Sequence, residues 1–203
     1  LILAHAGNLR PSDLNRQILQ SHNRIGLPRI EGLSERLRAL NPRLDIVPVS
    51  ENISADNAPS LVAEADVVLD AAPLFEERFA LNDAAIALQK PMVECAMYGL
   101  EAQITTFIPG HTGCLRCLVG AAPSYWKRQF PVLGAVSGTV GCLGAVEAVK
   151  LLTGMGSPLA NVLLTMDLGS MQFRRMRIAP APGCTVCSPY AKTMNLLSSS
   201  PKK

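Results

Sequence analysis

The sequence predicts an α/β protein with a Rossmann-like, mostly parallel sheet that has helices on both faces and is extended by antiparallel C-terminal strands. Three observations predict this fold. Strand-like apolar runs alternate with helix-like segments in the first half, as they do in a doubly wound sheet. Two apolar arms near the C-terminus flank the turn residues 168–170, as in a hairpin. Two Cys-x-x-Cys pairs, Cys114/Cys117 and Cys184/Cys187, provide a four-cysteine staple.

In the first half, helix-like and strand-like segments follow one another with short connections. The expected strands are 1–4, 44–49, 66–70 and 92–96, and the expected helices are 14–19, 31–40, 59–65 and 75–89. The helix over 31–40 should bury Leu33, Leu37 and Leu40 on one face, and Asn41-Pro42 ends it. The run 66–70 should be a buried parallel strand, because it is apolar along its centre.

After Gly99 strand-like and helix-like segments no longer alternate regularly. A strand over 103–108 leads to the first cysteine pair, an irregular stretch covers 119–131, and a helix is expected over 132–149. The strands 162–167 and 171–178 form the hairpin, and the second cysteine pair follows it. The serine-rich end, 195–203, is expected to be a flexible tail.

The helix expected over 132–149 has the composition of a possible membrane span, since Glu147 is its single charge. Its glycines recur every three or four residues, a spacing that lets helices approach other elements closely in membranes and in buried cores alike. Because the charged Lys150 directly follows the apolar run, we expect a buried helix and not a membrane span. Cys142 in this helix and Cys95 in an apolar run are expected to be inert core residues.

The two Cys-x-x-Cys pairs favour a structural zinc site, because each places two thiolates on one tight turn, and Gly113 and Gly183 precede them. Disulfides would suit a secreted chain, but no signal segment is visible at the N-terminus. A redox role would need only one pair, at a strand-to-helix turn. Residues 118–183 separate the pairs, so the metal would join two distant parts of a larger fold.

Composition narrows the function classes. The 203 residues suffice for one domain with a full core, or for one domain with an appendage. The net charge is only +3 and the basic residues form no stripe, so we expect no nucleic-acid partner, and we expect no membrane partner. The chain opens at Leu1, inside an apolar run, as a fragment or truncated chain would.

Residues 12–17, Ser-Asp-Leu-Asn-Arg-Gln, resemble the Ser-Asn-Leu-x-Arg-Gln segment of the ThiF/MoeB/HesA family, the adenylyltransferases that activate ubiquitin-like sulfur-carrier proteins. The similarity runs almost end to end. Its segments are 28–42, 65–70, 101–107, 113–118, 147–154 and 182–187. Their order and spacing, together with the four cysteines, make the resemblance specific.

The resemblance implies ATP-dependent activation of a carboxylate, in which the C-terminal Gly-Gly of a carrier attacks the α-phosphate of Mg-ATP and pyrophosphate leaves. It implies that Arg16 is the catalytic candidate, since a guanidinium can donate twice to a phosphate; a solvated turn residue is the alternative. It also implies a cytoplasmic homodimer that uses ATP, Mg²⁺ and structural Zn²⁺. The implied nucleotide-binding residues are Asp13, Arg16, Gln17, Arg29 and Asp70, and the implied zinc ligands are Cys114, Cys117, Cys184 and Cys187.

Several positions depart from the pattern that the resemblance supplies. His5-Ala6-Gly7 stands where relatives have Asp-x-Asp for the ribose, Asp13 replaces an asparagine, and Arg29 replaces a lysine. Pro73 replaces the second aspartate of Asp-x-Thr-Asp-Asn, which in relatives helps to hold magnesium. The glycine-rich nucleotide loop of relatives precedes the strand that begins here at Leu1.

Two functions are therefore expected: a sulfur-carrier adenylyltransferase, or a catalytically impaired relative that acts as a zinc-stapled binding or partner subunit. The chain as given should have little ATP activity. We expect a partial nucleotide-binding half over 1–108, lacking its first strand and glycine loop, a zinc-stapled carrier-binding half over 109–190, and a flexible tail over 191–203. Trp126 would contact the tail of a carrier or belong to a lid packed on its own domain.

Overall fold

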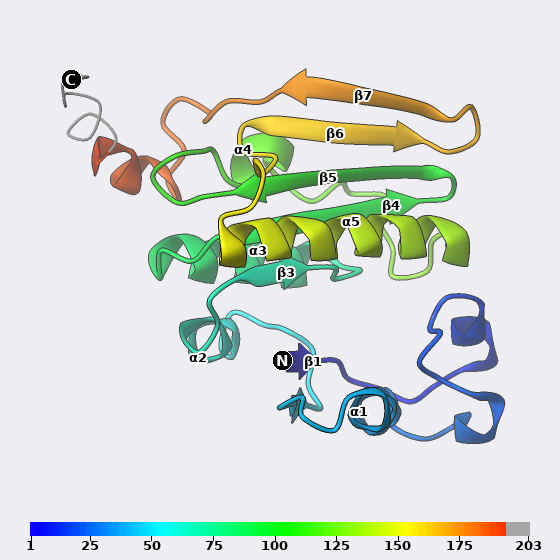
Figure 1. The fold of residues 1–203 in the computed structure, drawn as a ribbon. Helices are drawn as coiled ribbons and strands as arrows, with labels where there is room; N and C mark the ends of the chain where they lie inside the picture. Colours follow the sequence, from blue (N-terminus) through cyan, green and yellow to red (C-terminus); the bar gives the residue numbers. More distant parts are fainter. Residues whose placement is uncertain (194–203) are drawn as a thin grey trace.

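A computed structural model describes residues 1–193 of the protein as an α/β fold with two separate β-sheets (Figure 1). The small sheet pairs β1 (Ile2–Ala4) with β2 (Val47–Val49) in parallel. The large sheet has the order β3-β4-β5-β6-β7, in which β3/β4 is parallel and the other pairs are antiparallel. Its strands are β3 (Val68–Asp70), β4 (Met92–Tyr98), β5 (Glu101–Phe107), β6 (Val162–Asp167) and β7 (Gln172–Arg177).

These sheets confirm the predicted α/β class, with parallel strands in the first half and an antiparallel extension in the second. The helices also follow the predicted order. They are α1 (Arg29–Leu40), α2 (Ala58–Ala63), α3 (Phe75–Ala87), α4 (Leu115–Val119) and α5 (Gly134–Thr153), with the 3₁₀ helices η1 (Pro11–Asn15), η2 (His22–Arg24) and η3 (Ser188–Thr193). The helix expected over 14–19 is instead the earlier turn η1, which starts at a proline. The predicted tail over 195–203 lies outside the described residues.

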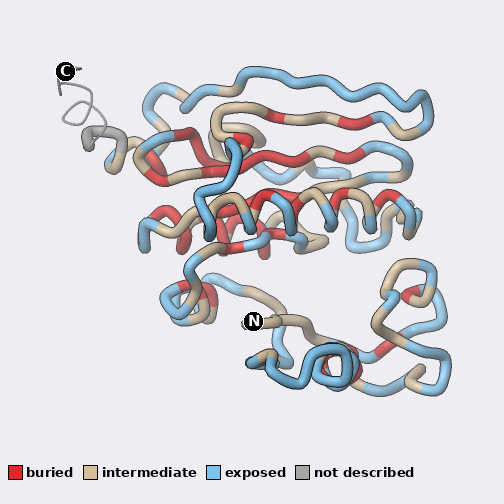
Figure 2. The backbone as a smooth tube through the Cα atoms, viewed as in Figure 1, coloured by how far each residue is buried: buried red, intermediate tan, exposed pale blue. Residues whose placement is uncertain are grey.

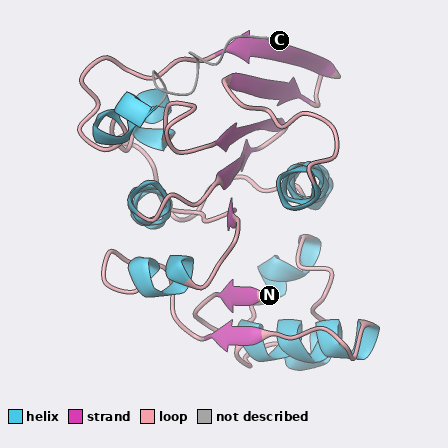
Figure 3. Cartoon of the chain, turned by 60° about the vertical axis from the view of Figure 1, so that its left-hand side comes forward, coloured by secondary structure: helices cyan, strands magenta, loops and turns pink. Residues whose placement is uncertain are grey.

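The large sheet is covered by α3 on one face and α5 on the other (Figure 3). Side chains of β4 alternate between these two layers, as the two-residue period of a strand requires. Met92 joins the cluster that includes Phe79 of α3, and Cys95 joins the cluster that includes Val136 of α5. Cys95 is thereby buried, as predicted. A Cβ atom at Gly144 would lie 2.6 Å from the Cys95 sulfur, so this glycine lets α5 rest directly on β4.

Helix α5 buries only one of its faces, so the expectation of a buried helix is confirmed for that face alone. It is the single helix within residues 1–193 with the length and hydropathy of a membrane span, and 22% of its most apolar stretch is buried. Its acidic residue, Glu147, is buried and accepts hydrogen bonds from Thr106 Oγ1 and the Leu159 N–H, both at 2.7 Å. Cys142 lies on the opposite, exposed face, so its prediction as a core residue was wrong.

Helix α1 buries only part of the face that was predicted. Ile30 and Ser34 are buried and Leu33 and Leu37 are half-buried, whereas Leu40 is 77% exposed. The Ser34 hydroxyl is satisfied by donating to the Ile30 carbonyl at 2.8 Å. Because α1 packs on the short strand β2, it has too little sheet to cover its last turn, and Leu40 remains in solvent.

A buried ionic network lies where β3 and β4 meet α3. The Arg78 guanidinium donates to Asp70 Oδ2 at 3.0 Å and to Glu94 Oε1 at 3.3 Å. Two carboxylates therefore share one cation. Burial raises the pKa of Glu94 to about 7 against the opposing effect of Arg78, and burial also raises the pKa of Asp70. These charges act inside the fold, between the sheet and α3.

The large sheet continues across residue 108, the predicted boundary between the two halves, because β5 pairs with β6. That division stays a prediction about function. At one edge of the sheet, every residue of β7 is exposed, and Figure 2 shows this strand in pale blue.

Candidate functional site

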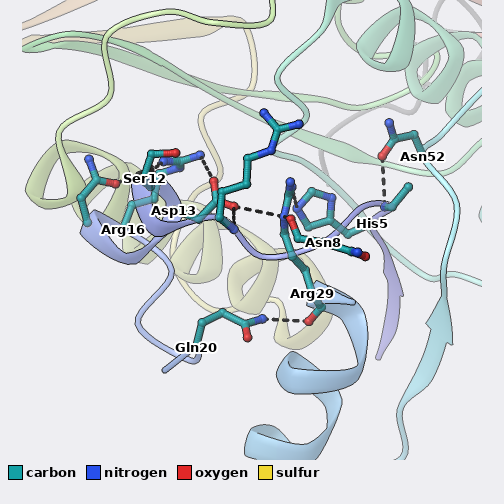
Figure 4. A network of polar contacts seen from close by, with 11 residues as sticks. His5, Asn8, Ser12, Asp13, Arg16, Gln20, Arg29 and Asn52 are labelled. Carbon is teal, nitrogen blue, oxygen red and sulfur yellow. Dashed lines mark hydrogen bonds and ion pairs between the residues drawn. The ribbon is translucent and has the colours of Figure 1, made fainter. Parts of the chain in front are cut away.

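A buried carboxylate, Asp13, organises the basic segment that the sequence singled out (Figure 4). Its Oδ1 accepts a hydrogen bond from Arg16 Nη2 at 2.9 Å, and its Oδ2 lies 3.2 Å from Arg29 Nε. The Arg10 backbone N–H also donates to Oδ2, at 2.9 Å. Asp13 is only 4% exposed, so two guanidinium groups and one amide compensate for its loss of hydration.

Arg29 links η1 to the end of β1. It is the first residue of α1 and is 9% exposed. Its Nε donates to the Asn8 carbonyl at 3.0 Å, and its Nη1 lies 3.0 Å from His5 Nε2. Burial, followed by the charge of Arg29, lowers the pKa of His5. The imidazole is therefore neutral at pH 7, with Nε2 as the acceptor for the guanidinium.

Arg16 is the more accessible of the two arginines that contact Asp13, with 30% of its side chain exposed. Its Nη1 donates to the Ser12 carbonyl at 3.0 Å and to Asn15 Oδ1 at 3.2 Å. With the bond to Asp13, three of the five N–H donors of the guanidinium are engaged within the described chain. The others can serve an anion, and the first three hold the group in place for it.

Gln17 belongs to the same turn. Its backbone N–H donates to the Asp13 carbonyl at 2.9 Å, and its side-chain oxygen is buried without a hydrogen bond within residues 1–193. The structure thus brings four of the five predicted nucleotide-binding residues, Asp13, Arg16, Gln17 and Arg29, into one network.

Asp70, the fifth residue, has a different role in the structure. Its side chain is fully buried at the end of β3, where Oδ2 binds Arg78 and Oδ1 accepts the Ala72 N–H at 3.1 Å. Both oxygens are therefore used to hold the strand end against α3. Pro73 follows in the same turn, and its carbonyl accepts the indole N–H of Trp126 at 2.9 Å.

Trp126 belongs to an irregular segment between α4 and α5, residues 120–131, which we call the strap. Its ring packs against Phe75, Tyr98 and Phe130, with centroids 5.2, 5.9 and 5.1 Å away. These contacts, together with the bond to Pro73, favour the alternative of a lid packed on its own domain. The strap ends where the Gly99 N–H donates to the Pro131 carbonyl at 3.0 Å.

One ion pair near this site was missed by the sequence reasoning. Arg128 of the strap lies 3.8 Å from Glu77 of α3, and Glu77 is 7% exposed. The charge of Arg128 also contributes to the lowered pKa values of His5 and Arg29. The sequence carries no local signal for this proximity, because residues 29, 77 and 128 belong to different elements.

The four cysteines of the two Cys-x-x-Cys pairs converge, with all four sulfur atoms within 4.8 Å of one another. The Cys114 sulfur lies 3.9 Å from that of Cys117 and 3.8 Å from that of Cys184, and the Cys117 and Cys187 sulfurs are 3.4 Å apart. A zinc ion bound by four thiolates requires sulfur separations of about 3.8 Å, the edge of a tetrahedron with Zn–S bonds of about 2.3 Å. A disulfide requires about 2.05 Å. The cluster therefore has the dimensions of a tetrahedral metal site.

Whether these thiols are protonated depends on what stabilises the negative charge of the thiolate form. Burial raises the pKa of Cys114 to about 11 and raises that of Cys187 as well. At Cys184 burial acts in the same direction, but hydrogen bonds led by the Cys187 N–H outweigh it and lower the pKa to about 7. A dication at the centre of the cluster would favour the thiolate form of all four.

The first cysteine pair is held from outside by α3. The Leu115 N–H at the start of α4 donates to Asn82 Oδ1 at 2.8 Å. Arg116 binds Asp83 at 2.6 Å through Nη2 and lies 4.4 Å above the ring of Phe79. Cys114 and the helix that follows it are thus fixed to the large sheet through α3.

The chain is similar to known proteins in sequence and in fold. A model of the ThiF family matches residues 2–186. Protein HesA of Leptolyngbya boryana is 47% identical over 191 residues, which cover 94% of this chain and 69% of HesA. A sulfur carrier protein adenylyltransferase of Thermus thermophilus is 36% identical over 87% of this chain and 68% of its own length.

A crystal structure of E. coli MccB with ATP has the same fold, with a TM-score of 0.77 and 21% identity. The match covers 92% of this chain and 58% of the MccB chain, so this chain spans less than two thirds of that solved structure.

The geometry of Asp13 gives a testable prediction about stability. Asp13→Asn removes the charge that compensates buried Arg29, and we expect a loss of about 3 kcal/mol in the free energy of unfolding, the cost of breaking a buried ion pair. Arg29→Lys should also destabilise. Because both variants break the same contact, the double variant should lose at least about 1 kcal/mol less than the sum. Urea denaturation measures all three.

The control for this cycle is Asp56→Asn, which removes the same charge from an exposed position. Its effect on the free energy of unfolding should be within about 0.5 kcal/mol of zero. Strict additivity of the Asp13 and Arg29 variants would show that the two side chains are not coupled.

Proposed function

The chain belongs to the ThiF family, and on that premise we propose that it activates the C-terminal Gly-Gly carboxylate of a ubiquitin-like sulfur-carrier protein, of the thiamine or molybdopterin type, by ATP-dependent adenylylation in the cytoplasm. The observation that carries the proposal is the cluster of guanidinium groups on Asp13. Arg16 and Arg29 are held by a buried carboxylate and surrounding carbonyls, so their orientation is set before an anion arrives.

In this proposal the chain's own residues orient phosphate and neutralise charge. Arg16 would offer its remaining N–H donors to the phosphate oxygens, and Arg29 would raise the local potential while holding His5 and the end of β1. Asp13 would keep both guanidinium groups in place as charge moves toward the leaving pyrophosphate. ATP would supply the phosphorus atom that the carboxylate attacks.

A second function, that of a catalytically impaired binding or partner subunit, is favoured by the turn after β3. The family pattern places a magnesium-binding aspartate at Pro73, which has no side-chain ligand to offer. Asp70 is fully buried and uses both oxygens within the fold. We therefore expect the 203-residue chain by itself to show weak adenylylation.

ATP–pyrophosphate exchange with a carrier protein ending in Gly-Gly separates the two functions. We expect slow exchange by the chain, lost when the carrier lacks its last glycine and reduced at least about tenfold in Arg16→Ala, which removes a charge-assisted phosphate contact. Carrier binding without any exchange would favour the partner-subunit function. Rapid exchange would contradict the expected weakness of a site with Pro73.

We also propose that the four-cysteine cluster binds structural Zn²⁺. The sulfur separations match a tetrahedral thiolate site, and the cluster joins the start of α4 to residues 184–187 after the β6–β7 hairpin. Zinc at such a closed site would stabilise the fold and leave no open position for catalysis.

Metal analysis of protein purified without chelator tests the zinc proposal. We expect about one zinc per chain, and Cys184→Ser should lower both this ratio and the melting temperature, by about 10 °C if about 3 kcal/mol is lost. Cys142→Ser is the matched control, since Cys142 is exposed on α5 and outside the cluster. A metal-to-protein ratio near zero in the unaltered chain would refute the proposal.

The exposed face of α5 is where we propose that a second copy of the chain binds. Val146, Val149 and Leu152 are 51, 49 and 60% exposed, and Ala145 and Cys142 lie on the same apolar face. Val146→Asp should convert dimers to monomers in light scattering at equal protein concentration, while Lys90→Glu, a charge change away from α5, should not. A wild-type monomer would exclude this interface.

A further inference from the structure

The strap carries a cation, Arg128, toward the basic cluster around Asp13. Its middle is fixed by Trp126, whose indole donates to the Pro73 carbonyl at 2.9 Å. Just beyond its end, the Val132 carbonyl accepts a hydrogen bond from Asn15 Nδ2 of η1 at 3.0 Å. Between these anchors lies Arg128. The backbone of the strap therefore spans from the turn after β3 to the turn that bears Asp13 and Arg16.

The partner of Arg128 within the described chain holds it only loosely. Arg128 Nη1 lies 3.8 Å from Glu77 Oε1, beyond hydrogen-bond distance, and 47% of the Arg128 side chain is exposed. The pair therefore lacks the hydrogen bond that strengthens a close ion pair, and a phosphate oxygen within hydrogen-bond distance would be a better acceptor for Arg128 than Glu77.

The charges around this position do not balance. Arg16 and Arg29 contact Asp13, and Arg128 contacts Glu77. The charge of Arg10 also contributes to the lowered pKa of Arg29. Four guanidinium groups thus face two carboxylates, and His5 between them is neutral. The cluster has an excess of two positive charges, which suits a ligand with several negative charges in a row.

We propose that Arg128 is a phosphate-contact residue: it leaves Glu77 to bind the oligophosphate chain of a nucleotide held by Arg16 and Arg29, and so draws the strap onto the occupied site. This inference rests on the proposed function for the identity of the ligand. It adds a residue that the family pattern in the sequence did not identify, and it gives the strap a direct electrostatic link to the site.

Trp126, the only tryptophan, lies two residues before Arg128 and can therefore report movement of the strap. Its ring packs on Tyr98 and Phe130 and its N–H is bonded to Pro73. Movement of Arg128 toward the phosphates would alter this environment, so the fluorescence of Trp126 reports the position of the strap.

Calorimetric titration of the full chain with ATP, and separately with inorganic tripolyphosphate, tests the inference. Arg128→Ala should weaken binding of both ligands at least about tenfold, as expected for loss of a charge-assisted hydrogen bond. Lys127→Ala, which removes the same charge from the adjacent exposed residue, should change binding less than about twofold. Tripolyphosphate should change the Trp126 emission in the unaltered chain and in Lys127→Ala, but not in Arg128→Ala.

A second variant acts in the opposite direction. Glu77→Gln frees Arg128 and should tighten tripolyphosphate binding, and this gain should shrink when Arg128→Ala is added. Equal binding by the unaltered chain and Arg128→Ala, with both folded by circular dichroism, would overturn the inference and leave the proposed nucleotide site intact. Binding of neither ATP nor tripolyphosphate to the unaltered chain would refute both.

Discussion

The convergence of four cysteine thiols is the constraint on which the C-terminal half depends. Cys114 and Cys184 are separated by most of that half, yet their sulfur atoms lie 3.8 Å apart. This contact fixes the start of α4, which α3 also holds through Asn82. The strap begins where α4 ends, so the position of Trp126 and Arg128 follows from the staple at one end and from the anchor at Val132 on the other.

A second constraint is the pairing of buried charge. Asp13 and Asp70 are both predicted nucleotide-binding residues and both are buried, but they have different partners. Asp13 holds Arg16 and Arg29 at an accessible turn, so its charge organises cations that can serve a ligand. Asp70 holds Arg78 beneath the sheet, where its charge serves the fold. The Asp13 carboxylate and the Arg29 guanidinium lie 3.2 Å apart, so each compensates for the buried charge of the other.

Much of the fold could be predicted because its signals are local. The periodicity of apolar residues located α2, α3, β3 and the β6–β7 hairpin, and the spacing of the cysteines predicted their convergence. Two of the errors concern which face of a helix is covered. Leu40 and Cys142 are apolar residues in apolar patterns, yet both are exposed, because the sheet beside each helix covers only one strip of it. Periodicity alone does not reveal how wide that cover is.

The sequence by itself determined the order of the elements, the family, the cysteine set and the segment that bears Arg16. Each of these depends on consecutive residues or on fixed spacings along the chain. The tertiary structure decided which charges meet. It pairs Asp70 with Arg78 inside the fold, and it bonds the Trp126 indole to the Pro73 carbonyl. It also brings Arg128 beside Glu77, near the Asp13 cluster. The physical reason is that electrostatic pairing depends on distance in space, and residues 13, 77 and 128 come together only when the elements that carry them have packed.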